Sequence, residues 1–373
     1  MQLIWDFQVS ASSEFSIKTS TGSYRVRIGS NLIDPCTVGN DVAWVIDANV
    51  ARLHASVMPP SFISQEATES AKNLESVTRL LEQLRDLGGT RHTHMMAAGG
   101  GIVQDLATFS ASCYMRGIRW TYLPTTMLSM VDSCIGGKSS LNVGRYKNIA
   151  GNFYPPEEVV IDTRFCETLT DEQMAEGLCE AAKICYAESD TTFADYLSLA
   201  ESQPMPPRGE QLARLIRHSL WTKKRFIEED EFDQGIRLLL NFGHTFGHAI
   251  EGATSYAISH GMAVGLGMLA AAHCSVRLGH MSNDLANVSS LTHHIRRLLR
   301  SAPHLSTSLQ KMRPEDAMEC FLSDKKHSAD FFTLILFDHK GRLQRVKLPR
   351  SDATQRELLL TFQHLSEQAY EIQ

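Results

Sequence analysis

The stretch Thr93-His-Met-Met-Ala-Ala-Gly-Gly-Gly-Ile-Val-Gln-Asp105 decides the fold of this chain. Its first six residues are a candidate for a buried β-strand, and three glycines follow at once. Glycines between a strand and a helix let the main chain approach a pyrophosphate, and the helix N-terminus stabilises its charge. The spacing differs from the Gly-x-Gly-x-x-Gly pattern of common dinucleotide folds. Glycine runs also form plain turns, so the nucleotide interpretation needs support from other segments.

Neighbouring segments supply that support. A helix is expected over Ser76–Leu87, whose apolar residues recur at helical spacing before Gly88. Strands are expected at Tyr24–Ile28, Val42–Ile46, Trp120–Leu123 and Glu158–Asp162. The alternation predicts a parallel α/β sheet that binds a nucleotide. Asp47 ends one of these strands, where a carboxylate can bind ribose hydroxyls or simply cap a turn.

The second half of the chain is mainly helical. Helices are expected at Asp171–Ala187, Phe193–Leu199, Gly209–Glu229, Arg237–Gly252 and Gly261–Leu278, followed by a strand pair at Phe331–Phe337 and Arg342–Leu348. We therefore predict an α/β nucleotide-binding domain over residues 1–166 and a mainly α-helical domain over residues 167–373. The active site is expected in the cleft between the two domains.

Composition excludes several classes of function. The chain has 373 residues, 43% hydrophobic and 21% charged, with a net charge of −6, which is typical of a globular enzyme and argues against nucleic-acid binding. The longest nearly apolar run, Gly261–Ala272, is too short to cross a membrane. Eight cysteines without a Cys-x-x-Cys pair, and an N-terminus unlike a signal peptide, predict a cytoplasmic protein.

A pair of histidines stands in Asn241-Phe-Gly-His-Thr-Phe-Gly-His248. On a helix, His244 and His248 share one face, and imidazoles at that spacing suit a divalent metal such as zinc. Thr245 stands where the helix of zinc proteases needs a Glu, and two histidines without a metal are the ordinary alternative. Glu180 and Lys183 share a face of another, largely apolar helix, and either form a surface ion pair or, if buried, need a metal and an anion as partners.

Basic side chains gather in and near Val131–Pro156. Lys138 follows two glycines, Lys147-Asn148 comes next, and Arg116 precedes them. Lysines and arginines beside glycines suggest phosphate contacts, although a single lysine in a polar loop is commonly a solvated surface charge.

Together these segments resemble the 3-dehydroquinate synthase family, within the wider group of sugar-phosphate cyclases. The matching motifs run in family order from about residue 47 to 337 and, in combination, are highly specific. They include Glu69-Ser-Ala-Lys72, Gly99-Gly-Gly101 with Asp105, Tyr114-Met-Arg-Gly117, Pro124-Thr-Thr126, Val131-Asp-Ser-Cys-Ile-Gly-Gly-Lys138, Lys147-Asn148, Glu180-Ala-Ala-Lys183, Arg237 to His248, His260-Gly261 and Asp324-Lys-Lys326.

The resemblance implies a role for individual residues. A zinc or cobalt ion would be bound by Glu180, His244 and His260, which moves His248 from the metal to the substrate's phosphate. The residues implied in catalysis are Asp132, Lys138, Lys183, Lys223, Arg237, Asn241 and His248; those implied in substrate binding are Arg116, Lys147, Asn148, Lys325 and Lys326. NAD would be held by Asp47, Glu69, Lys72, Gly100, Gly101, Asp105, Thr125 and Thr126. The family also implies a homodimer.

The implied reaction is that of a phosphate-eliminating carbon–oxygen lyase. A seven-carbon sugar phosphate, 3-deoxy-arabino-heptulosonate 7-phosphate, would become 3-dehydroquinate of the shikimate pathway. The steps are transient oxidation by NAD, loss of phosphate, re-reduction and intramolecular aldol closure. Arg237 and Lys223 favour a substrate that carries a carboxylate, since they would be costly to bury without one.

Several positions depart from the family pattern. Gln104 stands where Gly is usual, Tyr146 replaces a Gly, Met262 replaces a Glu, and Asn152-Phe-Tyr-Pro-Pro156 differs from Ala-Phe-Tyr-Gln-Pro. A cyclase of secondary metabolism, such as an amino-dehydroquinate, 2-epi-5-epi-valiolone or other cyclitol synthase, is therefore the alternative. A metal-dependent polyol dehydrogenase and a catalytically silent homologue are further alternatives.

Overall fold

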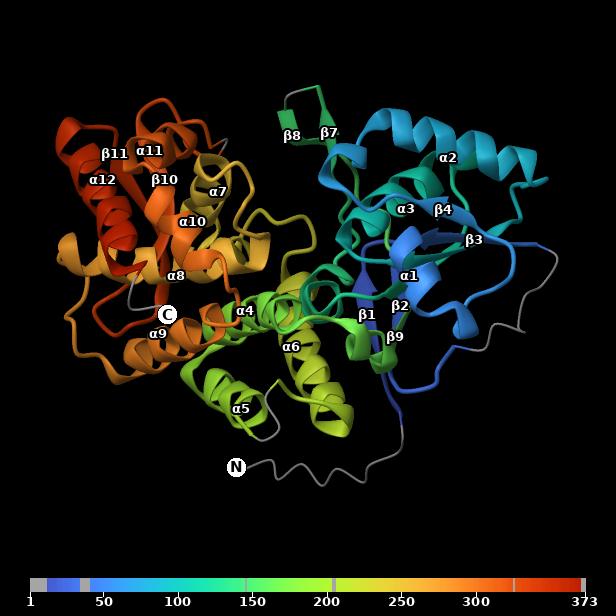
Figure 1. Ribbon diagram of the computed structural model, residues 1–373, viewed down its shortest axis with the longest axis horizontal. Coiled ribbons are helices and arrows are strands. Elements are labelled where there is room, and N and C mark those ends of the chain that lie inside the picture. Colours follow the sequence, from blue (N-terminus) through green and yellow to red (C-terminus); the bar gives the residue numbers. More distant parts are fainter. Residues whose placement is uncertain (1–11, 34–40, 145, 203–205, 325, 370–373) are drawn as a thin grey trace. The chain divides into compact units, whose positions relative to one another are not determined.

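The computed structural model describes residues 12–33, 41–144, 146–202, 206–324 and 326–369 (Figure 1). They fall into two compact units. Unit 1 comprises residues up to Thr168 together with Arg208–Leu220, and unit 2 comprises Leu169–Pro207 together with the residues from Trp221 onward.

Unit 1 is built on a seven-stranded sheet of order β1-β2-β9-β6-β5-β3-β4. The strands are β1 (Ser12–Thr19), β2 (Gly22–Gly29), β3 (Val42–Asp47), β4 (Ile63–Gln65), β5 (His94–Gly99), β6 (Trp120–Pro124) and β9 (Glu158–Asp162). All neighbours pair in parallel except β1, which forms an antiparallel hairpin with β2. The five expected strands are thus confirmed as parallel neighbours, whereas β1 and the short parallel strand β4 were not foreseen.

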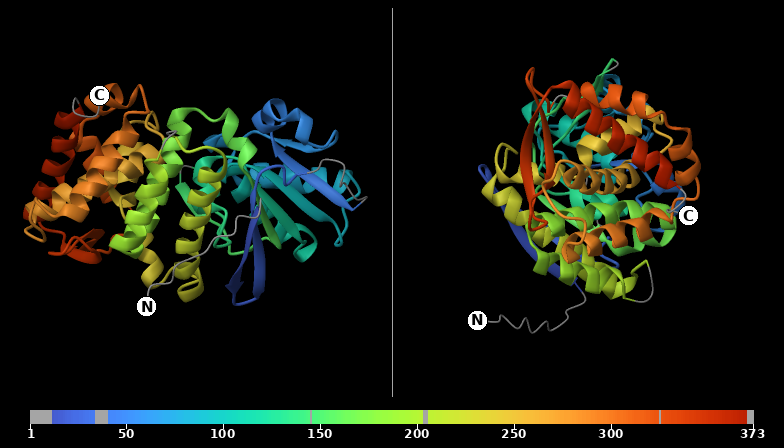
Figure 2. Two further views of the ribbon diagram at one scale, coloured as in Figure 1. Left: turned by 90° about the horizontal axis from the view of Figure 1, so that it is seen from below. Right: turned by 90° about the vertical axis from the view of Figure 1, so that its left-hand side faces the viewer.

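Helices cover this sheet where strands end. They are α1 (Ala48–Leu53), α2 (Leu74–Asp86) and α3 (Gly101–Cys113), with short turns at η1 (Ala55–Val57), η2 (Glu69–Ala71), η3 (Tyr114–Arg116), η4 (Ser129–Ser133) and η5 (Thr163–Thr168). Helix α2 begins where the side chain of Asn73 accepts a hydrogen bond from the Ser76 amide, and it is followed by Gly88 at φ +82°. Helix α3 packs on β3, β5 and β6 (Figures 1 and 2).

The predicted basic loop of unit 1 has more regular structure than expected. The strands β7 (Leu141–Val143) and β8 (Tyr146–Ala150) pair antiparallel there. The turn η4, which carries Asp132, is a single π-helical turn. Such turns occur frequently at functional sites.

Unit 2 is mainly helical, as predicted. Its elements are α4 (Asp171–Glu188), α5 (Asp190–Ala200), the later part of α6 (Gly209–Glu229), η6 (Ile236–Asn241), α7 (His244–Ala253), α8 (His260–Arg277), α9 (Ala286–Leu299), α10 (Leu305–Lys311), α11 (Pro314–Leu322), β10 (Phe331–Phe337), β11 (Leu343–Pro349) and α12 (Asp352–Glu367). Helix α8 is buried along most of its length and packs against α4, α7, α9, α12 and β10 (Figures 1 and 2). It is the central helix of this unit.

Glycines let the neighbouring helices touch α8 main chain to main chain. A Cβ atom on Gly267 would lie only 1.9 Å from the carbonyl oxygen of Gly243, before α7. A Cβ atom on Gly261 would lie 2.6 Å from the Cα atom of Glu176, in α4. No larger residue fits at either contact unless the helices move apart. The glycines therefore set how closely α4 and α7 approach α8.

The prediction of a single helix over Arg237–Gly252 is wrong. The segment divides into the 3-10 turn η6 and helix α7, and Gly243 between them has φ +77°. This left-handed conformation ends the hydrogen-bonded ladder, and it is one that glycine adopts at little cost. His244 therefore lies in the first turn of a helix and not in its middle.

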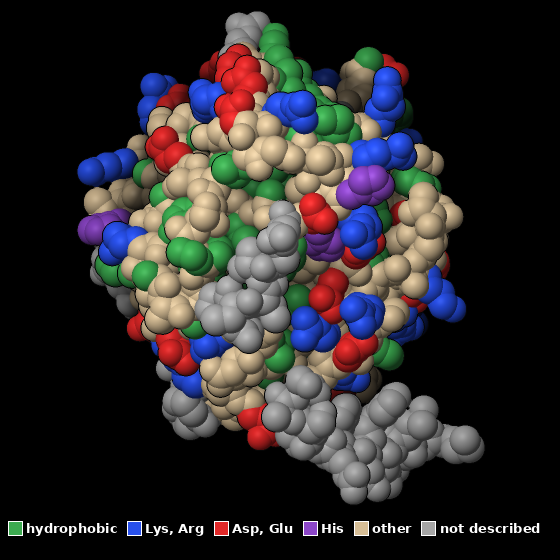
Figure 3. All heavy atoms as spheres, turned by 90° about the vertical axis from the view of Figure 1, so that its right-hand side faces the viewer, with side chains coloured by type: hydrophobic (Ala, Val, Ile, Leu, Met, Phe, Trp, Pro, Cys, Tyr) green, Lys and Arg blue, Asp and Glu red, His purple; other side chains and the backbone are tan. Residues whose placement is uncertain are grey.

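The described surface carries mixed charge. Figure 3 shows one face on which acidic and basic side chains are interspersed among apolar and neutral ones. Within the described parts of the chain, no helix is both long and apolar enough to cross a membrane.

Candidate functional site

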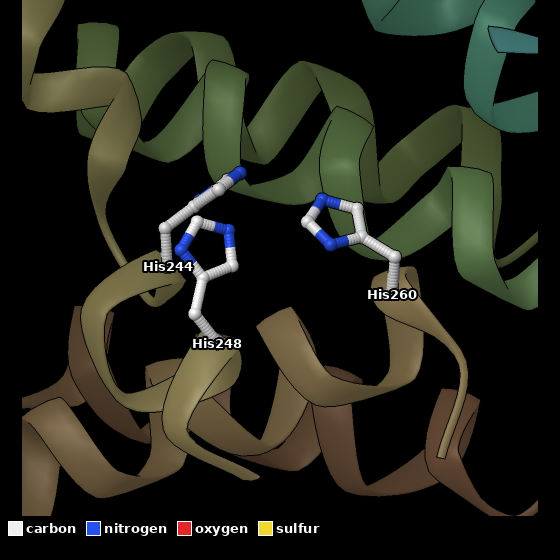
Figure 4. Close-up of side chains that lie close together, drawn as sticks. All are labelled: His244, His248 and His260. Atoms are coloured by element: carbon white, nitrogen blue, oxygen red, sulfur yellow. The ribbon is translucent and has the colours of Figure 1, made fainter. Parts of the chain in front are cut away.

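Three imidazole rings converge in unit 2 (Figure 4). His244 and His248 extend from one face of α7, and His260 is the first residue of α8. One ligand nitrogen from each of the three lies within 4.8 Å of the others, and the ring centroids of His244 and His260 are 5.3 Å apart. The cluster forms because the contact between Gly243 and Gly267 brings α7 against α8.

The carboxylate of Glu180 joins this cluster from α4. Its Oε1 atom lies 3.4 Å from Nε2 of His260 and 3.7 Å from Nε2 of His244. Its Oε2 atom contacts the ammonium group of Lys183, one turn along the same helix. The side chains of Glu180 and Lys183 are only 1% and 2% exposed, so the ion pair predicted as a possible surface feature is buried.

These distances fit a divalent metal. Ligands on a tetrahedral zinc ion, bound at about 2.0–2.1 Å, stand about 3.3–3.4 Å apart. The two separations from Glu180 Oε1 to the imidazole nitrogens are close to that value. His248 lies near enough to belong to the same cluster, since its ring centroid is 5.4 Å from that of His244. The donor set of one carboxylate and two imidazoles is that of a catalytic zinc site.

The three histidines have different pKa values because their electrostatic environments differ. Burial, with Lys183 and His260 nearby, lowers the pKa of His244 well below its usual value. Burial and His244 lower the pKa of His248 to about 3. Burial acts in the same direction on His260, but Glu180 and Glu251 outweigh it and raise its pKa to about 10. The position between these two carboxylates therefore favours positive charge.

Each imidazole next to Glu180 is also held at its other nitrogen. Nδ1 of His244 lies 3.2 Å from the carbonyl oxygen of Phe242. Nδ1 of His260 lies 3.3 Å from both carboxylate oxygens of Glu251. An Nδ1–H that donates to these oxygens leaves the Nε2 lone pair facing Glu180.

Several predicted anion contacts also lie in unit 2. Lys223 in α6 and Arg237 in η6 are 6% and 4% exposed. The main-chain amide of Arg237 donates to the carboxylate of Asp230 at 3.0 Å, and its guanidinium donates to the carbonyl of Glu231 at 2.6 Å. Asn241 ends η6 and donates to the carbonyl of Leu238.

The predicted pair of lysines after α11 is only partly described. The ammonium group of Lys326 pairs with Asp324 at 2.7 Å, and its charge contributes to the lowered pKa of His248. It therefore acts on the histidine cluster. Lys325 lies outside the described residues.

In unit 1 the structure brings the predicted cofactor residues together with the predicted substrate hairpin. The ammonium group of Lys72 lies 3.2 Å from Asp105 and donates to the side-chain oxygen of Asn148 at 2.7 Å. The carboxylate of Glu69 lies 3.1 Å from the ammonium group of Lys147. Asp105 accepts two hydrogen bonds from Ser140, at 2.9 and 3.1 Å.

Other predicted residues of unit 1 lie at ends of strands and in turns. Gly100 caps α3, and a Cβ atom on it would lie 3.0 Å from the methyl group of Thr126. The Thr125 amide donates to Gly99, and Asp47 accepts from the Asn49 amide as the cap of α1. Gly101 is the first residue of α3.

Three other predicted site residues of unit 1 are Asp132, Lys138 and Arg116. Asp132 lies in η4, and Lys138 bridges to Phe153. Arg116 and the preceding Met115 have φ of +69° and +49°. Such conformations are costly for residues other than glycine and are found mainly where function requires them.

The sequence interpretation missed three supporting residues: Ser140, which binds Asp105; Asp230, which binds the loop of Arg237; and Glu251, which binds His260. Only Glu251 had a signal in the sequence. It stands seven residues after His244, at the spacing that continues the face of His244 and His248.

Two solved synthases share the fold of this chain. A crystal structure of 2-deoxy-scyllo-inosose synthase complexed with carbaglucose-6-phosphate, NAD⁺ and Co²⁺ matches with a TM-score of 0.80 and 24% identity, over 94% of this chain and 99% of that one. The structure of 2-epi-5-epi-valiolone synthase from Streptomyces hygroscopicus, with NAD⁺ and Zn²⁺ bound, matches with a TM-score of 0.75 and 24% identity, over 97% of this chain and 100% of that one.

Comparison of the amino-acid sequence with known families identifies the family of this chain. Models of the 3-dehydroquinate synthase N-terminal and C-terminal regions match residues 62–176 and 177–327. The 3-dehydroquinate synthase of Natranaerobius thermophilus is 35% identical over 349 residues, which cover 88% of this chain and 93% of that protein. The chain therefore belongs to the 3-dehydroquinate synthase family, and the expectation from its motifs is confirmed.

Proposed function

We propose that this protein converts 3-deoxy-arabino-heptulosonate 7-phosphate to 3-dehydroquinate with loss of phosphate. The observation that carries the proposal is the convergence of Glu180, His244 and His260 beside the buried ammonium group of Lys183. It stands in a chain that is 35% identical to a curated 3-dehydroquinate synthase over most of its length. The cofactors proposed are NAD, held by the predicted residues of unit 1, and zinc or cobalt, held by the cluster of unit 2.

The two cofactors would supply the redox and Lewis-acid chemistry: NAD takes and returns a hydride, and the metal polarises the reacting oxygen. The residues of the chain bind and orient the substrate. Lys183 is buried against Glu180, where its charge can stabilise an oxygen that becomes negative. The imidazole of His248, whose pKa is low, stays neutral and can accept or donate a hydrogen bond to a phosphate.

Arg237 supports the choice of a substrate with a carboxylate. Its guanidinium is nearly completely buried, and Asp230 holds its main chain in place. A planar guanidinium in a fixed position suits the paired oxygens of a carboxylate. Sedoheptulose 7-phosphate and glucose 6-phosphate have no carboxylate and so could not make this paired contact.

A phosphate-release assay with the metal-loaded protein and NAD tests this proposal. We expect phosphate release from the heptulosonate phosphate, without accumulation of NADH, and faster than from sedoheptulose 7-phosphate or glucose 6-phosphate. Faster release from sedoheptulose 7-phosphate would instead support a cyclase of secondary metabolism. NADH that accumulates without phosphate release would support a polyol dehydrogenase, and no turnover would support a silent homologue.

Two expectations about assembly and location belong to the same proposal. We infer a homodimer from the family, and light scattering would test it. We infer a cytoplasmic protein, and the thiols support this: seven cysteines in the described parts of the chain are free, and burial raises the pKa of Cys166, Cys179 and Cys185. Localisation of the tagged protein in its own cells would test the second inference.

A further inference from the structure

Glu251 stands in an unusual position relative to the histidine cluster. It lies on α7 with His244 and His248, at positions i, i+4 and i+7 of one face. Its side chain is 14% exposed and turns towards α8, where both carboxylate oxygens lie 3.3 Å from Nδ1 of His260. The imidazole of His260 thus lies between two carboxylates, with Glu251 at Nδ1 and Glu180 at Nε2.

We propose that Glu251 is a positioning residue, which fixes the ring orientation and tautomer of His260 so that Nε2 faces the metal position beside Glu180. Neutral imidazole carries one proton, on either nitrogen. A carboxylate at Nδ1 keeps the proton there and leaves the lone pair on Nε2. The partner's negative charge also makes Nε2 a stronger donor to a cation.

The need for such a residue follows from where the two histidines lie. His244 lies inside the fold, and a main-chain carbonyl, that of Phe242, holds its Nδ1. His260 begins α8, and its side chain is 37% exposed compared with 15% for His244. An imidazole at an exposed helix start can rotate more freely than one in a packed turn. The carboxylate of Glu251 holds Nδ1 of His260, as the main-chain carbonyl of Phe242 holds Nδ1 of His244.

This inference rests on the metal site of the proposed function, but it is tested without turnover. Metal-free protein and the variants Glu251→Gln and Glu251→Ala are titrated with zinc in competition with a chromogenic chelator. We expect Glu251→Ala to bind one zinc ion with a dissociation constant roughly 10- to 100-fold higher than the unmutated protein. Glu251→Gln keeps an acceptor oxygen but loses the charge, so its affinity should lie between the two.

The matched control is Glu357→Gln. Glu357 in α12 also binds a side chain of α8, Arg277, at 2.7 Å, but near the opposite end of that helix. The zinc affinity of the Glu357→Gln variant should equal that of the unmutated protein. With Co²⁺ in place of zinc, the visible absorption bands should shift in the two Glu251 variants and stay unchanged in the control. Thermal unfolding of the metal-free proteins checks that each variant is folded.

Two results would overturn the inference. Unchanged zinc affinity and an unchanged Co²⁺ spectrum in both Glu251 variants would mean that Glu251 does not position the ligand. Complete loss of zinc from a folded Glu251→Gln variant would make Glu251 itself a ligand. A protein that shows the expected zinc affinities but converts no sugar phosphate would contradict the proposed function alone.

Discussion

Lys72 donates a hydrogen bond of 2.7 Å to the side-chain oxygen of Asn148 while it also pairs with Asp105 at 3.2 Å. The ammonium group of Lys72, whose side chain is 9% exposed, thus joins residues proposed to hold NAD to a hairpin proposed to bind substrate. The two proposed binding sites therefore share a residue, and a change at Lys72 should affect both.

Replacement of Lys72 by alanine tests this coupling. Charged hydrogen bonds contribute about 1.5–3 kcal/mol each, so we expect the dissociation constant for NAD to rise at least roughly tenfold. The KM for the sugar phosphate should rise as well, because Asn148 loses the hydrogen bond from Lys72. Lys340→Ala, at an exposed position, is the control and should change neither value. If NAD affinity falls while the substrate KM stays the same, the two sites are not coupled through Lys72.

Asp230 offers a way to disturb Arg237 without removing its charge. Its carboxylate accepts hydrogen bonds from the amides of Gln234, Gly235 and Arg237, at 2.9, 2.7 and 3.0 Å. Asp230→Ala should release this loop, and we expect kcat/KM for the heptulosonate phosphate to fall roughly 10- to 100-fold, as loss of about 1.4–3 kcal/mol implies. The preference over sedoheptulose 7-phosphate should shrink at the same time. An unchanged preference would show that the loop does not set the specificity.

Gly243 and Gly279 form a natural pair for comparison. Both have left-handed backbone, at φ +77° and +72°, but a Cβ atom on Gly243 would lie 2.6 Å from the carbonyl oxygen of Val264, whereas Gly279 has open space around it. Gly279→Ala should cost about 1–2 kcal/mol of unfolding free energy for its conformation alone. We expect Gly243→Ala to cost more and to weaken zinc binding, because α7 must move away from α8. Urea unfolding measures the first effect and chelator competition the second.

Asp162 predicts how the stability depends on pH. Its carboxylate is 1% exposed and lies 2.6 Å from the guanidinium of Arg164. Burial raises its pKa, but the bonds from Arg164 and from the Leu32 amide outweigh this and hold the pKa below its usual range. A lowered pKa means that the stabilisation is complete above the unfolded value of about 3.9 and is lost as the pH falls through the folded value.

The variant Asp162→Asn isolates that contribution. We expect the free energy of unfolding of this variant to be about 3 kcal/mol lower at pH 7, because the substitution removes the charged partner of Arg164. The difference from the unmutated protein should stay constant from pH 8 to 5 and shrink only below about pH 4. Urea unfolding at several pH values measures this difference. A difference that already shrinks between pH 7 and 5 would contradict the lowered pKa.

The sequence predicts the elements of this fold better than it predicts their interruptions. The buried strands and the long amphipathic helices follow from apolar periodicity, and β5 with its glycine turn lies within one residue of its predicted position. The break at Gly243 was missed because apolar residues continue at helical spacing on both sides of it. Strand β1 alternates buried and exposed residues, but it lacks the strongly apolar run that marked the other strands.

For the site, motifs identified the residues but not how they are held. Glu180, His244 and His260 come from three helices, and only their packing shows that two imidazoles face one carboxylate oxygen. Asp230 accepts hydrogen bonds from nearby main-chain amides, and Ser140 donates to one carboxylate; such local contacts leave no pattern in a sequence. The structure adds these supporting contacts to the motif residues.

The glycine contacts of α8 have a consequence for how unit 2 unfolds. Because the three proposed ligands lie on α4, α7 and α8, and glycine contacts hold α8 against the other two helices, the complete set of ligands cannot persist once α8 separates from α4 or α7. Release of a bound metal ion should therefore be coupled to unfolding of the whole helical unit. At 1,000 times its dissociation constant the metal ion would add about 4 kcal/mol to the stability of unit 2, and calorimetry should show a single transition that moves up in temperature with metal concentration.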